Sequence, residues 1–212
     1  MIDASMQEVS IIFGVAVLIM SVVIHEVSHG YVAGILGDQT AKYAGRLTLN
    51  PLKHLDIFGS IVVPLLTYFA GGFIFGWAKP VPYNPYNLKN QKWGPGIVAA
   101  AGPLSNLLVV LFFSLILRIA PSVAPLPSSF LAIAVSIMFV NITLAVFNLI
   151  PLPPLDGSKI LFALLPYRWA KAQNVLEKYG FILLLLVIFF FLQWLSPIVF
   201  TLLKFFTGGA LL

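Results

Sequence analysis

The sequence predicts an α-helical polytopic membrane protein. Of its 212 residues, 60% are hydrophobic and only 9% are charged, whereas soluble proteins contain about 25% charged residues. Long apolar runs alternate with short polar loops, and a helix needs about 20 mostly apolar residues to cross the hydrocarbon core of a bilayer. No linker or change of composition divides the chain, so we expect one membrane domain over residues 1–212. The absence of cysteine excludes disulfides and thiolate sites.

The apolar runs predict four to five membrane helices. The first run extends from about Val9 to Leu36 and is followed by Gly37, a residue type that commonly stops helices. A second long run covers about 94–119, and a third covers about 130–165 with a proline-rich break at 151–154. The last, at about 181–206, is expected to be an accessory C-terminal helix.

A shorter apolar run lies between the first two spans. Residues 57–69 would form a helix of about 20 Å, which is shorter than the hydrocarbon core of about 30 Å. The β-prone piece Phe73-Ile74-Phe75-Gly76-Trp77 follows it. We expect a re-entrant or interfacial helix with a short β element, and a fifth crossing at 57–75 is the alternative.

Basic residues predict the orientation of the chain. If 57–75 does not cross, the loops 38–56, 78–93 and 166–180 share one side and carry nine basic residues: Lys42, Arg46, Lys53, Lys79, Lys89, Lys92, Arg168, Lys171 and Lys178. Cytoplasmic loops carry an excess of Lys and Arg, so we expect these loops in the cytosol, the N-terminus outside and the protein in the plasma (inner) membrane. The net charge of +5 therefore indicates membrane orientation and no nucleic-acid partner.

The first span contains the segment His25-Glu26-Val27-Ser28-His29. Histidines four positions apart share one face of a helix, and two imidazoles so placed can hold one Zn²⁺ ion. Glu26, directly after the first histidine, has the position of a general base in zinc peptidases. Ionisable groups inside a membrane span are costly and usually functional, so we interpret this segment as a metal site and not as a chance pattern.

A catalytic zinc site needs three protein ligands and one open position. Outside the first span, Asp156 is the acidic residue that lies within an apolar run, two positions after Pro154 and directly before Gly157. It is the candidate third ligand, and a helix cap after a proline kink is the alternative. We expect Gly157 to let the chain turn tightly beside the site.

These motifs together resemble the site-2 protease family of intramembrane zinc metalloproteases. The resemblance rests on segment 25–29 paired with Asn148-Leu-Ile-Pro-Leu-Pro-Pro-Leu-Asp-Gly157, and Gly102-Pro-Leu-Ser-Asn106 is similar to a third family element. It covers about residues 20–165. It implies His25, His29 and Asp156 as ligands of one zinc ion per chain, and Glu26 as the general base. No inserted PDZ-like or C-terminal regulatory domain is evident, so we expect a minimal form.

Other polar residues have two interpretations each. Asn148 and Asn106 are candidates for substrate binding, with interhelical hydrogen bonds as the alternative. We expect Asn141 to serve helix packing and His54 to be an interfacial polar residue that is not a fourth ligand. Arg46 and Lys53 are expected to face lipid headgroups.

The expected function is hydrolysis of a peptide bond in or near a transmembrane segment of another membrane protein, close to the cytosolic face. The partners would then be a transmembrane substrate and the lipid bilayer. The alternatives are a membrane metal transporter using the same three ligands, for which no internal repeat is seen, and a non-catalytic scaffold with a metal site.

Overall fold

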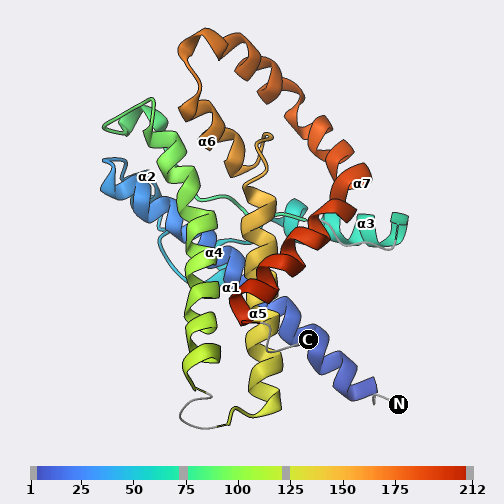
Figure 1. Ribbon diagram of the computed structural model, residues 1–212. Coiled ribbons are helices and arrows are strands. Elements are labelled where there is room, and N and C mark those ends of the chain that lie inside the picture. Colours follow the sequence, from blue (N-terminus) through green and yellow to red (C-terminus); the bar gives the residue numbers. More distant parts are fainter. Residues whose placement is uncertain (1–3, 72–75, 121–124, 209–212) are drawn as a thin grey trace.

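The computed structural model describes residues 4–71, 76–120 and 125–208, which are mainly helical (Figure 1). Long helices are α1 (Ala4–Ile35), α4 (Gly94–Ile119), α5 (Ser128–Asn148) and α7 (Ala170–Thr207). Short helical elements are α2 (Thr40–Tyr43), η1 (Pro51–Lys53), η2 (Phe58–Val62), α3 (Val63–Gly71), η3 (Pro85–Asn87), α6 (Asp156–Leu164) and η5 (Tyr167–Trp169). The described ranges contain no β-strand.

Three helical stretches are long and apolar enough to cross a membrane: Ile12–Ile35, Gly94–Ile119 and Ser128–Asn148. The two halves of α7, which are bent by 76°, make a fourth if they are counted as one span. Large apolar side chains such as Leu108, Phe112 and Phe190 are 60–65% exposed, as expected of helix faces that contact lipid. The class of a polytopic helical membrane protein is therefore confirmed.

Helix α4 lies at the centre of the fold and contacts α1, α5, α6 and α7. A buried core joins α4, α5 and α7, and its members are Val110, Leu117, Ala134, Met138, Ile142 and Val199. Near the start of α4, Val98 packs with Ala33 of α1 and Leu88. Because α4 contacts both α1 and α6, it brings together two segments that are about 130 positions apart in the sequence.

The short apolar run forms η2 and α3, which lie crosswise to α4 and α5 (Figure 1). Residues 72–75 of the expected β element lie outside the described residues, while Gly76 and Trp77 are in a non-helical segment without strand pairing. Residues 76–84, which we call the 76–84 segment, run without regular structure. Backbone hydrogen bonds tie Trp77 to Gly59 at 3.0 Å and Lys79 to His54 at 2.8 Å.

Arg46 corrects one prediction, because its side chain is only 7% exposed and does not lie on the surface. Its Nη2 donates to the carbonyl oxygen of Lys79 at 2.7 Å and to that of Pro80 at 3.4 Å. The guanidinium group thus satisfies backbone carbonyls that the irregular 76–84 segment leaves without partners of its own. The prediction that Arg46 faces lipid headgroups was wrong.

Candidate metal centre

Helix α1 places His25 and His29 one turn apart on the face that packs against α4. Both histidines are buried, at 5% and 9% exposure. Their ring centroids are 4.7 Å apart and the rings are nearly perpendicular. The two histidines therefore lie on one face of a helix, as their spacing predicts.

Asp156 is the first residue of α6 and comes after an irregular connection that contains the cis peptide bond Pro153–Pro154. Its Oδ2 lies 3.1 Å from Nε2 of His25 and 3.2 Å from Nε2 of His29. Gly157 does not have a positive φ; a Cβ here would instead collide with the carbonyl oxygens of Leu149 and Ile150. The lack of a side chain at Gly157 therefore permits a close approach of two backbone segments next to Asp156.

The hydrogen bonds at Nδ1 determine which nitrogen of each ring carries the proton. Nδ1 of His29 lies 2.7 Å from the carbonyl oxygen of Val98, and a carbonyl can only accept, so Nδ1 is the donor. Nδ1 of His25 lies 2.7 Å from Oδ1 of Asn106. In both rings the Nε2 atom faces the carboxylate of Asp156, and in a neutral ring with the proton on Nδ1 this Nε2 carries the lone pair.

This arrangement fits a metal ion. One ligand atom each from His25, His29 and Asp156 lies within 4.8 Å of the others. Two neutral imidazoles and a carboxylate offer only electron pairs at this point, and such a group needs a cation to be stable when buried. Imidazole and carboxylate donors suit Zn²⁺, and an Nδ1–H hydrogen bond to an outer acceptor is the usual support of a metal-ligating histidine.

Gly102 of α4 lies directly against this group. A Cβ at this position would be 2.5 Å from Nε2 of His25 and 2.5 Å from Nε2 of His29. Only a residue without a side chain leaves the space beside the two ligand nitrogens open. Gly102 therefore leaves room for the two histidines, and its small size also permits close helix packing.

Glu26 lies on the same turn of α1 and is half-buried. Its Oε2 accepts a hydrogen bond from the backbone N–H of Val81 at 2.8 Å. Val81 also packs on Gly30, where a Cβ would meet its side chain at 2.8 Å. The 76–84 segment thus crosses the turn of α1 that carries His25 and His29, and it holds the Glu26 carboxylate.

Sequence comparisons identify the family of the chain. The family model described as Peptidase family M50 matches residues 121–187, a stretch that includes Asp156. A protein of Bacillus subtilis (strain 168), named "Putative zinc metalloprotease YwhC", is 41% identical over 181 residues, which cover 82% of this chain and 78% of that protein. This chain belongs to peptidase family M50, the site-2 protease family.

Two more distant relatives of this M50 member bear similar names. "Putative zinc metalloprotease MJ0611" of Methanocaldococcus jannaschii is 31% identical and covers 74% of this chain and 76% of its own length. "Putative zinc metalloprotease Rip2" of Mycolicibacterium smegmatis is 29% identical, and the chain spans 64% of its length. No solved structure matches significantly.

The other predicted site residues of this M50 member lie in different surroundings. Asn106 is fully buried behind His25, and its amide donates to Asn141 Oδ1 and to the Ser21 carbonyl. Asn148 is half-buried at the end of α5, and its amide donates to the Leu144 carbonyl at 3.0 Å. Substrate binding by both residues stays a prediction. His54 is buried, bonds the Thr48 carbonyl and is not part of the metal group.

Sequence reasoning did not single out Ser21, whose backbone carbonyl bonds Asn106 and whose hydroxyl bonds Asn141. The interhelical bonds of Asn141 agree with its expected place in helix packing. Ser21 precedes His25 by four residues, as His25 precedes His29, so helical spacing alone would have placed it on the same face. The backbone partners Val98 and Val81 have no signal in the sequence, because any residue type offers the same carbonyl and N–H.

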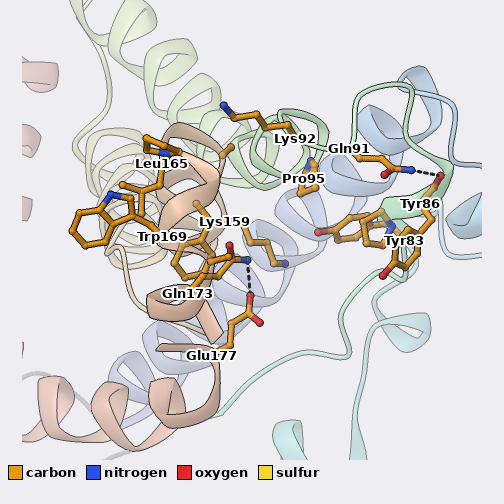
Figure 2. Close-up of a pocket in the computed structure, with 15 residues that line it drawn as sticks. Tyr83, Tyr86, Gln91, Lys92, Pro95, Lys159, Leu165, Trp169, Gln173 and Glu177 are labelled. Carbon is orange, nitrogen blue, oxygen red and sulfur yellow. Dashed lines mark hydrogen bonds between the residues drawn. The ribbon is translucent and has the colours of Figure 1, made fainter. Parts of the chain in front are cut away.

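Figure 2 shows a pocket of about 490 Å³. It is lined by residues between positions 83 and 95, by residues of α6 and by residues between positions 165 and 177, including Tyr83, Tyr86, Lys159 and Trp169. Lys159 lies 5.4 Å from the centre of the Tyr83 ring. None of the three grouped ligand residues lines this pocket, so it is separate from the metal centre although Lys159 and Asp156 share helix α6.

Proposed function

We propose that this M50 member is a zinc-dependent endopeptidase that hydrolyses a peptide bond in or near a transmembrane segment of a membrane-protein substrate. The observation that carries the proposal is the convergence of two imidazole nitrogens and one carboxylate oxygen within 4.8 Å, with a second carboxylate on the same turn. The three ligand residues are more than nine-tenths buried among apolar helices. Such a site has no evident purpose in packing alone.

His25, His29 and Asp156 would hold the zinc ion. A bound zinc ion polarises a carbonyl and lowers the pKa of water toward about 7. Val98 and Asn106 hold the two imidazoles by their Nδ1 atoms, so that each Nε2 stays a lone-pair donor. Glu26 would carry out the proton transfers.

Glu26 would accept a proton from the attacking water and return it to the leaving amide nitrogen. Its Oε2 is held in place by the N–H of Val81. An extended substrate is needed, because the carbonyls of a helix are occupied by its own hydrogen bonds.

The loops at 38–56, 78–93 and 166–180 would face the cytosol, with cleavage close to that side of the plasma (inner) membrane. The proposal is supported by the basic residues of these loops and by the position of Asp156. That residue begins α6, and the end of α6 at Leu164 is followed closely by the basic 166–180 region.

Co-expression with candidate single-span membrane proteins tests the function. We expect wild-type protein to produce shortened fragments whose new ends, mapped by mass spectrometry, fall in or next to the transmembrane segment. The Glu26→Gln variant should leave the same substrates intact. Fragments that form equally with the variant would come from another protease, and if no candidate in a broad set is cleaved only by wild type, the proposed activity is refuted.

A further inference from the structure

Behind the metal centre, a chain of buried hydrogen bonds extends from His25 to α5. Asn106 Nδ2 lies 2.8 Å from Asn141 Oδ1 and 3.3 Å from the Ser21 carbonyl. Asn141 Nδ2 lies 2.9 Å from Ser21 Oγ and 2.9 Å from the Ile137 carbonyl. The three side chains are 0–4% exposed, so water does not compete for these bonds.

The direction of every bond in this chain is determined by its ends. The Ile137 carbonyl can only accept, so the Asn141 amide nitrogen must face it, and the Asn141 oxygen must face Asn106. Asn106 then has to donate to both Asn141 and the Ser21 carbonyl, which turns its own oxygen toward His25. Nδ1 of His25 is therefore the donor to Asn106, and in the neutral ring that a metal ion requires, Nε2 then carries the lone pair.

We propose that Asn141 and Ser21 are positioning residues for the metal centre, which set the tautomer of His25 through Asn106. The inference rests on the proposed zinc site and assigns to α5 a function beyond packing. His29 does not depend on this network, because its Nδ1 bonds the Val98 carbonyl directly. Disruption of the network should therefore affect one ligand of the pair and spare the other.

The experiment uses the three histidines of the chain as reporters. Full-length protein labelled with ¹⁵N-histidine and loaded with zinc in lipid gives solid-state spectra in which Nδ1–H and Nε2–H tautomers are distinct. Asn141→Leu keeps the volume and removes the amide, and Ser21→Ala removes one acceptor. Thr143→Val is the matched control, since the Thr143 hydroxyl also bonds a carbonyl of α5, that of Phe139 at 2.8 Å.

We expect the Nδ1–H signal of His25 to weaken or shift in Asn141→Leu while the His29 signals stay unchanged. Zinc affinity should fall by about 10- to 100-fold, as is typical when a partner of a ligating histidine is lost. Ser21→Ala should lie near the lower end of this range, and Thr143→Val should match wild type. A purely structural effect of the substitution would disturb both histidines alike.

Unchanged His25 signals and unchanged zinc affinity in both variants would overturn the positioning role and leave the zinc site intact. Equal disturbance of His25 and His29 would overturn it as well. If Asn141→Leu does not accumulate in membranes, Asn141→Ala, which also removes the amide, takes its place with the same expected result and the same contrary results. Wild-type protein that binds no zinc is a different failure, because it would refute the proposed metal site itself.

Discussion

Glu26 Oε2 accepts a hydrogen bond from the backbone N–H of Val81 at 2.8 Å. This contact joins the turn of α1 that carries His25 and His29 to the 76–84 segment, which Arg46 holds by the carbonyl oxygens of Lys79 and Pro80. The carboxylate is thus positioned by a backbone group that mutation of a side chain does not remove.

The first prediction concerns Glu26→Gln. The amide oxygen of glutamine can still accept from Val81, so the 76–84 segment should keep its place, but the amide cannot accept a proton. We expect cleavage to fall by on the order of 10²- to 10⁴-fold, the usual contribution of a general base, with zinc content unchanged. Peptide-fragment quantification and metal analysis of the same preparation measure both. Wild-type cleavage by this variant would exclude Glu26 as the base.

The second prediction concerns the ligand set. His25→Ala, His29→Ala and Asp156→Ala should each remove zinc from a protein that otherwise contains about one ion per chain, because a site with two ligands is weak. His54→Ala is the matched control, since His54 is buried but bonds only Thr48 through its side chain. Atomic absorption on the purified variants gives the answer. Full zinc content in Asp156→Ala would remove Asp156 from the set.

The third prediction concerns Gly102→Ala. The new Cβ would lie 2.5 Å from the Nε2 atoms of both histidines, so we expect zinc binding and cleavage to be lost. Helix propensity favours alanine over glycine by about 1 kcal/mol, so the variant should still fold. Gly14→Ala makes the same substitution in α1 where a Cβ meets nothing within 4 Å. Equal zinc affinity of the two variants would contradict the close approach.

The fourth prediction concerns topology. Single cysteines placed at the exposed positions Lys42, Lys89 and Lys171 should be labelled from the cytosolic side, and one at Ser128 from the other side. The natural chain has no cysteine, so each label reports one position. Opposite accessibility of positions 42 and 89 would mean that the 57–75 region crosses the membrane.

The fifth prediction concerns Asp38, which connects the end of α1 to the loop before α4. Its carboxylate accepts from Thr40 N and Oγ1, from Asn84 N and from Asn87 Nδ2. Burial opposes the charge, but these hydrogen bonds together lower the pKa of Asp38 below its usual 3.8. A lowered folded-state pKa contributes stability that is complete above the unfolded value and is lost as the pH falls through the folded value.

Asp38→Asn should therefore be less stable than wild type at pH 7, by about 1–3 kcal/mol for the loss of charged hydrogen bonds. The difference should shrink as the pH falls below 3.8. Thermal unfolding of both proteins in detergent at several pH values measures it, and the comparison cancels the titration of shared groups. A difference that is independent of pH would mean that the carboxylate charge is not what stabilises this loop.

The sequence by itself determined the helical membrane class and the pairing of His25 with His29. Both follow from short-range regularities: the length of an apolar run against the thickness of a bilayer, and the period of a helix. The end of α1 was also predictable, since Gly37 has a φ of 112°, which suits glycine and terminates the helix.

Only the tertiary structure decided which distant groups meet. His25 and Asp156 are 131 positions apart, and their contact depends on α4 packing between α1 and α6 and on the glycine at 157. The buried position of Arg46 depends on the Lys79 and Pro80 carbonyls of the 76–84 segment, to which it donates. The hydrogen-bonded connection from Asn141 to His25 depends on the packing of α1, α4 and α5. Local sequence patterns do not predict such contacts, because a buried polar group needs a hydrogen-bond partner and that partner can lie far away in the sequence.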